Sequence, residues 1–575
     1  MAFGYHGRYL RIDVTNGAGE FVRLDDTLLR EYLGGSGLGV RLLLDTGAAE
    51  ADPLAPEAPL IFAFSPLVGS PLTTSAKFAV VSKSPLTGRI NDSLSSSGFA
   101  VAGKRSGCDA IMIVGRAPQL SAIVIDDGEV RLESAEEFRG ATCPETEAGL
   151  RARLGNGYRI ASIGPAGESA VRYASVSHDG RHAGRGGSGA VLGAKNIKAI
   201  AVRGTQYTEW AHPRELTELS RSLSKRSFGP ATAKYRELGT ASNLLTFNRF
   251  GTLPTRNFQT GSFEEAANLS PEGLSETRSK TRDSCVACTI GCEHIYSLGK
   301  TRVRVEYENL FALGSLCGVS DADAVLRASQ RCDELGIDTI SAGGTIAFAM
   351  ECVERGWLKE QWLTFGSGEA LLRALDLIGS REGIGDLLAE GSRRAAQVIG
   401  HNSIAIAPQV KGLEIPGYEP RALQTMALGF AVGARGADHN RSGAYEVDFS
   451  AKVDRRNVTT DAVRHAIETE DKAALMDSLI MCKFLRGVFE DFYAESAEML
   501  RKVTGWEVTA DELRETAKRI VSAKRQFNVL AGWTPAEDTL PERFLNTPLP
   551  NDPAASLSRK RLDLLVAEYH RQRGW

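Results

Sequence analysis

Short apolar runs separated by turn residues dominate the first 207 residues. GRYLRIDV, the Asn16-Gly17 turn and FVRL form a hairpin pattern, because Asn-Gly favours the tight turn that joins two twisted antiparallel strands. Further runs with the length and flanking residues of strands are APLIFAFSP, KFAVVSKS, DAIMIVGR, SAIVID and AIAVRG. This region is therefore predicted to be β-rich, with few helices.

From Pro213 the pattern becomes helical. Apolar residues recur at intervals of three and four in LTELSRSLSKRS, DADAVLRASQRCDELGID, ISAGGTIAFAMECVERG and EALLRALDLIG. After about residue 405 the stretch KGLEIPGYEPRAL opens a second mainly helical region, which ends in the amphipathic pattern LSRKRLDLLVAEYHRQRG. We predict an α+β fold with a β-rich domain at 1–207 and two mainly α-helical domains at 208–405 and 406–575.

Length and charge narrow the class of protein. A chain of 575 residues exceeds one hydrophobic core, and a net charge of −3 gives no reason to expect nucleic acid or a membrane surface as a partner. The N-terminal MAFGYHGRYLRIDV lacks the apolar core of a signal peptide, and no later stretch approaches 18 uninterrupted apolar residues. We expect a cytoplasmic enzyme with no membrane partner.

Glycine is the compositional outlier. The chain has 59 glycines, about a tenth of its residues, where about 7% is usual. They gather in LGGSGLG (33–39) and AGRGGSGAVLGAK (183–195). Such runs let the backbone approach other groups closely, so we expect a large polar ligand beside them.

Four cysteines carry the most specific chemical signal. Cys285, Cys288 and Cys292 form a C-x2-C-x3-C run, and Cys482 lies far downstream in DSLIMC. Three close thiolates with one remote thiolate suit a four-iron cluster. Structural zinc and inert buried thiols are the alternatives, although zinc sites usually take two closely spaced pairs. Nine cysteines in this length is sparse and odd in number, which disfavours disulfides.

A six-residue frame that begins with aspartate occurs twice and is the second chemical signal in the sequence. Asp333 to Asp338 and Asp477 to Cys482 share the pattern D-x-x-x-x-[D/C], one in each predicted α-domain. An inward-facing aspartate can accept two hydrogen bonds from an aminopyrimidine, which is the edge of a pterin. In the second frame the closing residue is also the fourth cysteine. Read alone, each frame also fits a solvated helical aspartate.

These features together resemble the tungsten-containing aldehyde ferredoxin oxidoreductase family over nearly the whole chain. The resemblance rests on KSPLTGRIND (83–92), RHAGRGGSGAVLGAKNIKAIAV (181–202), CVACTIGC (285–292), VEYENLFALGSLCG (305–318), CDELGIDTISAG (332–343), GLEIPGYEPRA (412–422), GARGADHNR (433–441) and DSLIMC (477–482). It implies tungsten or molybdenum held by two pterins, one 4Fe-4S cluster, and magnesium linking the pterin phosphates. The β-domain would form a base under the bis-pterin, and the two α-domains would enclose it.

The resemblance also implies cofactor contacts, residue by residue. In the first domain they are Lys77, Asn91, Ser93, Arg181, His182 and Gly184. In the α-domains they are Asp333, Ile337, Asp338, Arg435, Arg441, Asp477, Met481 and Lys483. The cluster ligands would be Cys285, Cys288, Cys292 and Cys482. The chain departs from the family pattern at Lys77, where arginine is common, and at Ile480 and Met481, which replace glycine and leucine.

The run GRGGSG (184–189) also matches a dinucleotide-binding fingerprint. We expect no such site, because the preceding ASVSHDGRHA is polar, which predicts no buried strand, and no acidic residue ends a strand about 20 residues later. The same glycines fit backbone pressed against a pterin phosphate, with Arg181 supplying charge.

By position in the motifs, Glu308 and His439 are the candidate catalytic residues. Oxidising an aldehyde to an acid needs an oxygen nucleophile, a proton acceptor and a two-electron sink, and burial can raise the pKa of a carboxylate toward neutrality. His439 could hydrogen-bond the carbonyl oxygen. Without the motifs, a surface carboxylate and a core histidine are the plainer interpretation. Cys317 is either a further metal ligand or a small buried apolar residue.

Three functions compete. The first is oxidation of an aldehyde to a carboxylic acid, with electrons passed to ferredoxin or an iron–sulfur subunit. The second is the catalytic subunit of an aromatic acyl-CoA reductase complex of the benzoyl-CoA type. The third is a cofactor-free or zinc-stabilised binding protein, which the retained cysteines, aspartate frames, Glu308 and His439 disfavour. The sequence does not choose between tungsten and molybdenum, or between homo- and hetero-oligomers.

Overall fold

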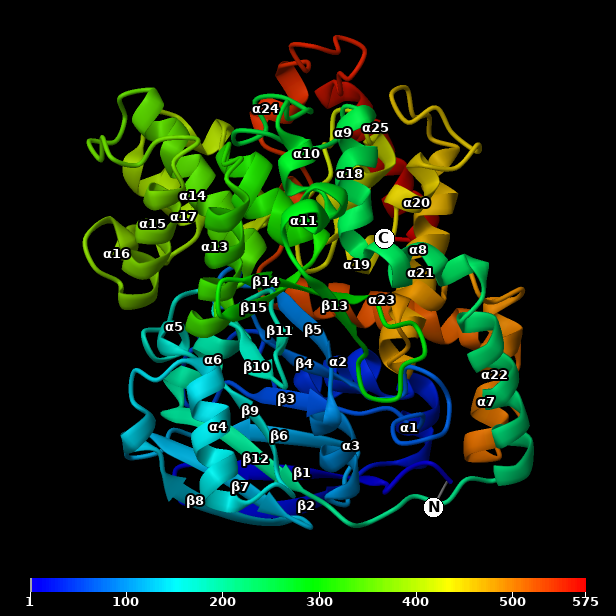
Figure 1. Cartoon of the computed structure of the whole chain (residues 1–575). Coiled ribbons are helices and arrows are strands. Elements are labelled where there is room, and N and C mark those ends of the chain that lie inside the picture. Colours follow the sequence, from blue (N-terminus) through cyan, green and yellow to red (C-terminus); the bar gives the residue numbers. More distant parts are fainter. Residues whose placement is uncertain (1–2) are drawn as a thin grey trace.

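The computed structural model describes residues 3–575 and confirms the predicted α+β class, with a sheet-rich N-terminal region followed by mainly helical regions (Figure 1). The first six-stranded sheet has the order β2 (Ala18–Arg23), β1 (Arg8–Asp13), β6 (Ala110–Val114), β3 (Leu60–Ala63), β4 (Lys77–Lys83), β5 (Ile90–Ser96). The second has the order β11 (Arg181–Ala183), β10 (Val176–His178), β9 (Arg159–Ser162), β12 (Ile197–Arg203), β7 (Ser121–Asp126), β8 (Glu129–Ser134).

The main helices fall into three sets along the chain. The first set is α1 (Asp26–Tyr32), α2 (Gly35–Asp45), α3 (Gly98–Arg105), α4 (Cys143–Leu154) and α6 (Ser188–Ala194). The second is α7 (Pro213–Ser227), α8 (Ala233–Leu238), α9 (Asn243–Arg249), α12 (Tyr307–Asn309), α13 (Ala322–Leu335), α14 (Thr339–Glu354), α15 (Gly368–Ser380) and α17 (Ser392–Ile399). The third is α18 (Gln424–Val432), α19 (His439–Ser442), α21 (Ala462–Leu479), α22 (Phe492–Thr504), α23 (Ala510–Leu530) and α25 (Arg559–Arg573). Within residues 3–575, no helix has the length and apolar character needed to span a membrane.

The two large sheets pack face to face because side chains alternate along each strand. Ile111 and Ile113 of β6 lie in one core with Ile123 and Ile125 of β7. Met112, on the opposite face of β6, belongs to a second core that α2 and α23 help to form. The N-terminal region is therefore layered, with helices covering the outer face of the first sheet.

The helical regions share one large core. It runs from Ala241, before α9, to Tyr569 on α25, and it also takes in Tyr173 and Ala190 of the N-terminal region. Helix α14 lies inside it, with buried residues on every side. Packing also crosses the predicted boundary at residue 405, since Leu216 and Leu223 of α7 join a separate apolar cluster with Leu500 of α22. The two helical regions therefore bear directly on each other around the candidate site.

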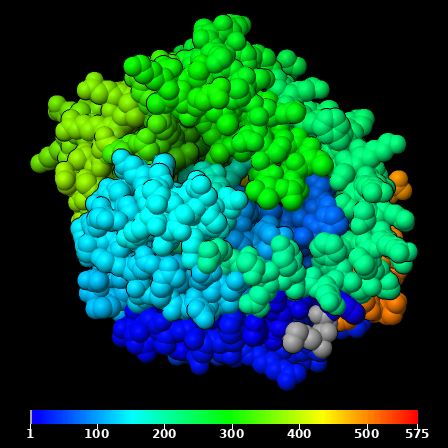
Figure 2. Space-filling view, turned by 60° about the horizontal axis from the view of Figure 1, so that its bottom comes forward, coloured from blue at the N-terminus to red at the C-terminus, as the bar shows by residue number. Residues whose placement is uncertain are grey.

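A three-stranded antiparallel sheet interrupts the helices, in the order β13 (Lys280–Asp283), β14 (Glu293–Leu298), β15 (Thr301–Val305). The run EHIY, directly after Cys292, forms the first part of β14. The connection from β13 to β14 carries Cys285, Cys288 and Cys292. Green surface from this part of the chain overhangs blue surface of the N-terminal region in Figure 2.

The expectation that no buried strand precedes GRGGSG was wrong. β10 is buried, and β11 leads directly into the glycine run. Because β10 and β11 are only three residues each and antiparallel, they do not supply the long parallel strand of a dinucleotide-binding unit. The run instead turns the chain from the edge of the second sheet into α6.

The expectation of a ligand beside LGGSGLG also needs correction. A Cβ atom on Gly37 would overlap the Tyr32 carbonyl oxygen and lie 3.0 Å from Ser478 Oγ, while the Gly37 N–H donates to that Oγ at 3.0 Å. Protein atoms therefore explain this glycine. It lets α2 approach the end of α21, where the second aspartate frame begins.

We predict that Gly37→Ala lowers the free energy of unfolding by about 1–3 kcal/mol, because the backbone carbonyl of Tyr32 cannot rotate away as a side chain would. A urea titration would measure the change. The matched control is Gly157→Ala, where an added Cβ would meet its nearest neighbour, Arg203 Cδ, at an ordinary 3.4 Å. Equal unfolding curves for the two variants would contradict this account of Gly37.

Candidate active site and metal centre

The four predicted cluster cysteines come from two segments that the structure brings together. Cys288, Cys292 and Cys482 all pack against one apolar cluster. Thr74 joins the two segments, because its N–H donates to the Ala287 carbonyl at 2.5 Å and its Oγ accepts from the Cys482 N–H at 3.3 Å. The loop before β4 therefore holds the cysteine run and Cys482 in fixed relation.

The charge environment links these thiols to the second aspartate frame. Burial, reinforced by the nearby Cys482, raises the pKa of Cys288 to about 11. Burial opposes the charge on Lys77, but Cys482, Cys285 and Asp477 outweigh it and raise the pKa of Lys77. Lys77 thus lies where it can neutralise both the thiolates and the Asp477 carboxylate. Among residues 3–575, no three His, Cys, Asp or Glu side chains are grouped so as to hold a single metal ion.

The second frame is built around a buried carboxylate, Asp477, near the end of α21. Its oxygens lie 2.8 Å from Lys483 Nζ and 3.1 Å from Arg441 Nη1. Burial lowers the pKa of Lys483 to about 8, against the attraction of Asp477. The structure therefore brings Asp477, Lys483 and Arg441 together and makes this part of the site cationic.

A buried aspartate that the sequence analysis did not single out anchors the same part of the site. Asp92 on β5 pairs with Lys524 of α23 at 2.7 Å and with Arg441 at 3.2 Å. Its carbonyl accepts from Arg435 Nη1 at 3.0 Å. Burial opposes ionisation, but Arg441 and Lys524 hold the pKa of Asp92 well below its usual range.

The first frame lies across from Gly184. Asp338 caps the N-terminus of α14, accepting from the Ser341 N–H at 3.2 Å, and pairs with Arg185 Nε at 3.3 Å. Asp333, near the end of α13, lies 3.0 Å from His182 Nε2. A Cβ atom added to Gly184 would meet nothing nearer than Asp338 Oδ1 at 3.9 Å. Gly184 therefore borders open space in front of the first frame, whereas Gly186, Gly187 and Gly189 are packed against protein atoms.

The remaining first-domain candidates lie on β5 and β11. Asn91 and Ser93 share one face of β5, because they are two residues apart, and Asn91 Nδ2 donates to Ser188 Oγ at 3.0 Å. Arg181 on β11 pairs with Glu306 at 3.2 Å and also with Glu293. Both carboxylates already engage Arg181, so its charge is partly neutralised by protein.

Two predicted contacts differ from the rest, because their side chains are apolar and packed in cores. Ile337 lies in the large helical core and Met481 in the cluster that holds the cysteines. Between the frame's ends, Ile480 takes a φ of 63°. This is the left-handed region that glycine adopts without strain and that costs other residues about 1–2 kcal/mol. The chain therefore keeps the backbone geometry typical of glycine at that position.

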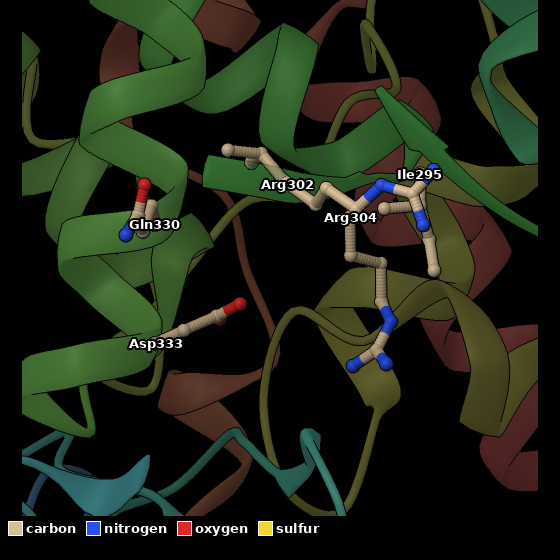
Figure 3. Close-up of a pocket in the computed structure, with 6 residues that line it drawn as sticks. Ile295, Arg302, Arg304, Gln330 and Asp333 are labelled. Carbon is tan, nitrogen blue, oxygen red and sulfur yellow. The ribbon is translucent and has the colours of Figure 1, made fainter. Parts of the chain in front are cut away.

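A cavity of about 240 Å³ opens beside the first frame (Figure 3). Its lining residues are Ile295, Arg302, Val303, Arg304, Gln330 and Asp333. Gln330 and Asp333 project from α13, while Arg302 and Arg304 come from β15 (Figure 3). Asp333 is thus reached from outside, whereas Asp338 is buried. The cavity includes neither of the predicted catalytic residues.

Glu308 and His439 form the catalytic candidate pair. Glu308 Oε1 lies 3.7 Å from His439 Nε2, and its other oxygen accepts from the Gly417 N–H at 3.1 Å. Burial raises the pKa of Glu308 to about 8 and lowers that of His439 to about 3. At neutral pH the structure therefore favours a protonated Glu308 beside a neutral histidine. The rings of Tyr418 and His439 stack with centroids 5.0 Å apart, which fixes the imidazole.

Cys317 lies apart from this charged site. Its Sγ contacts the carbonyl oxygens of Ala312 at 3.3 Å and Gly343 at 3.6 Å. Burial alone raises its pKa. These contacts match a small buried residue and do not support metal ligation.

Several buried polar atoms of the site have no hydrogen-bond partner among residues 3–575. They are Asn91 Oδ1, Arg435 Nε and Nη2, Glu308 Oε1 and His439 Nδ1. Leaving such a group unsatisfied costs about 1–3 kcal/mol. A large hydrogen-bonding ligand that offers both donors and acceptors fits this set, because Arg435 supplies donors and Asn91 and Glu308 supply oxygen atoms. A bis-pterin with its phosphates has that chemistry.

The sequence analysis missed Arg185, Asp438 and Asp92. Arg185 Nη1 donates to the Ala437 carbonyl at 2.7 Å, and Asp438 pairs with Arg435 at 3.4 Å. All three lie inside motifs that were quoted for the resemblance. The presence of a charged residue within a glycine-rich or apolar motif could have marked each of them as a candidate site residue.

Comparison with known proteins identifies the family. The model of the aldehyde ferredoxin oxidoreductase N-terminal domain matches residues 9–204, and the model of domains 2 and 3 of that enzyme matches residues 218–575. The chain belongs to the aldehyde ferredoxin oxidoreductase family. The resemblance read from the motifs is confirmed, and the chain is an oxidoreductase of that family.

Relatives align over the whole chain. The tungsten-containing aldehyde ferredoxin oxidoreductase of Pyrococcus furiosus is 37% identical, covering 100% of this chain and 96% of its own length. The enzyme of the same name from Thermococcus kodakarensis is 36% identical with the same coverage. The solved active-site complex BamBC of benzoyl coenzyme A reductase, with 1,5-dienoyl-CoA, shares the fold, with a TM-score of 0.85 at 24% identity over 100% of this chain and 95% of that chain.

We predict that Asp92→Asn destabilises this family member by about 3–5 kcal/mol, because it leaves Lys524 buried without its counter-charge and leaves Arg441 with Asp477 as its close carboxylate partner. Denaturant unfolding of the purified protein would measure the loss. Asp45→Asn is the control, since Asp45 forms an exposed helical pair with Arg41 and should change stability by less than about 1 kcal/mol. A loss no larger than that of the control would show that Asp92 does not anchor the site.

Proposed function

We propose that this protein oxidises an aldehyde to a carboxylic acid at a tungsten (or molybdenum) bis-pterin centre and passes the electrons through a 4Fe-4S cluster to ferredoxin or an iron–sulfur partner subunit. The observation that carries the proposal is the Glu308–His439 pair, whose side chains are 20% and 12% exposed and whose charged neighbours include Asp338 and Arg185. The chain is 36–37% identical, over its whole length, to enzymes that are named for this activity, and this similarity supports the proposal. In this proposal residues 1–207 form the base, and 208–405 and 406–575 enclose the site.

The cofactor would be held by residues from all three regions. Asp333, Asp338, His182 and Gly184 would hold one pterin, and Asp477, Arg441, Lys483 and the main chain at Met481 the other. Lys77, Asn91, Ser93, Arg181 and Arg435 would contact the phosphates and their linking magnesium, and Ile337 would pack against the first pterin. When bound, the metal centre would accept an electron pair and the cluster, on Cys285, Cys288, Cys292 and Cys482, would carry single electrons outward.

The reaction balances as an aldehyde plus water giving a carboxylic acid, two protons and two electrons. Glu308 would take the proton in its ionised form, whose population grows as the pH rises through the Glu308 pKa of about 8. His439, neutral and fixed against Tyr418, can donate a hydrogen bond to the aldehyde oxygen. Both residues act through their position within a shielded site, where hydrogen bonds to a developing charge are strongest.

Reduction of an aromatic acyl-CoA is the competing function. The solved benzoyl coenzyme A reductase complex shares the fold at 24% identity, which carries no activity to this chain. Cys317, whose thiol contacts two backbone carbonyl groups, gives this function no support as a metal ligand. Aldehyde oxidation is therefore the function that the site supports best.

Metal analysis of anaerobically purified protein tests the cofactor assignment. We expect about four irons, one tungsten or molybdenum and two pterins per chain, following the one-cluster, bis-pterin assignment. Cys482→Ser should lower the iron content and abolish the reducible cluster signal, while Cys317→Ser, a matched buried thiol, should leave both unchanged. Zinc in place of iron, or an unaltered signal in Cys482→Ser, would refute the cluster.

Glu308→Gln should depress turnover about 100-fold or more while leaving metal and pterin content intact. Because a base must be deprotonated, the wild-type rate should rise with pH through about 8, the pKa of Glu308. Aldehyde oxidation with a dye acceptor between pH 6 and 9 measures both effects. Glu369→Gln on the exposed start of α15 is the control, and a wild-type rate independent of pH in this range would rule out Glu308 as the base.

A further inference from the structure

The cysteine run lies at a surface that exposes large apolar side chains. Val286 is 46% exposed, and Phe228, directly after α7, is 58% exposed. The two are linked through the residues beside them, because Ser227 Oγ and Thr289 Oγ1 are 2.6 Å apart. Thr73 Oγ1 lies 2.8 Å from the same Thr289 oxygen. Phe228 and the cysteine loop therefore belong to one surface.

Cationic side chains surround these two apolar residues. The exposed cations of segments 221–239 and 278–286 are Arg221, Lys225, Lys234, Lys280 and Arg282, whereas the exposed carboxylates there are Glu237 and Asp283. The Arg236 guanidinium lies 4.4 Å from the centre of the Phe228 ring. Lys280 and Arg282 share one face of β13, and Lys280 Nζ reaches the Glu237 carbonyl at 3.1 Å. We name this surface, centred on Val286 and Phe228, the cationic rim.

These five cations are available to a partner. Two other arginines of these segments already have carboxylate partners, since Arg226 pairs with Glu495 at 2.5 Å and Arg278 pairs with Asp323. The ion pairs found among residues 3–575 include none of the five. The rim has more exposed cations than exposed carboxylates, whereas the whole chain has a net charge of −3. An apolar centre with a charged border is the usual anatomy of a transient protein interface.

We propose that the cationic rim is the docking surface for an acidic, ferredoxin-type iron–sulfur protein. The inference rests on the proposed function, because it takes the four cysteines to hold the cluster from which electrons leave. Docking over Val286 puts the partner beside Cys285, which is itself partly exposed. Each encounter would pass one electron to the partner, which would be reduced, so two encounters would be needed for each aldehyde oxidised. Opposite charge steers the encounter, and the apolar centre holds it briefly.

The test separates docking from chemistry by changing the electron acceptor. Holoenzyme carrying Lys225→Glu and Lys280→Glu should show a KM for a purified acidic two-cluster ferredoxin raised about 10-fold or more, and a weaker dependence of the rate on salt. Its rate with a small viologen dye, which needs no docking surface, should match wild type. Phe228→Ala should raise the ferredoxin KM with no change in salt dependence.

The matched control carries Lys359→Glu and Lys560→Glu, which make the same charge change at exposed positions after α14 and in α25. It should leave the ferredoxin KM unchanged. A ferredoxin KM unchanged in the rim variant, or raised equally in the control, would overturn the docking site. Absence of dye-linked aldehyde oxidation in wild type would instead refute the proposed function, so the two failures are distinguishable.

Discussion

The buried ion-pair network around Asp92 is the constraint on which the site depends. Its carboxylate joins β5 of the first sheet to Lys524 of α23 and Arg441 of α19, so one residue ties the sheet-rich region to two separate helices. Arg441 in turn reaches Asp477. Removing charges from water costs several kcal/mol per ion, and only close pairing and hydrogen bonds recover it. The relative positions of these elements are therefore fixed by electrostatics as well as by apolar packing.

This network also explains why the site is cationic without being unstable. Arg435 keeps two nitrogens unpaired, and Asn91 keeps its carbonyl oxygen unpaired. A folded chain tolerates such groups where other interactions determine the structure and a ligand later satisfies them. Ile480 follows the same logic, since its left-handed backbone is held by the packing of its side chain, which is almost fully buried.

Local sequence patterns predicted most of the strands and helices, but they did not predict contacts between residues that are far apart in the sequence. The hairpin at Asn16-Gly17 and the helices from Pro213 followed from turn chemistry and periodicity, which are local properties of the chain. The buried strand β10 was missed because VSH carries no apolar alternation, and its burial comes from the neighbouring strands β9 and β11. The glycines of LGGSGLG were assigned to a ligand because a sequence shows that backbone comes close to something, but not to what. Gly37 meets Tyr32 and Ser478, and the second of these is more than 400 residues away.

The same limit applies to the site. Motif position supplied Glu308 and His439, and the structure places them 3.7 Å apart. Motif position did not identify Arg185 as a site residue. Its role depends on contacts with Asp338 and with the Ala437 carbonyl, which only the folded structure shows. The pKa values of the catalytic candidates likewise depend on burial, which is a property of the whole fold. Burial separates the two groups in opposite directions, giving an acid that titrates near pH 8 beside an imidazole that stays neutral. Such a pair combines a group that exchanges a proton with a neutral group that can form a hydrogen bond at one point of the site, which neither residue would do at the surface.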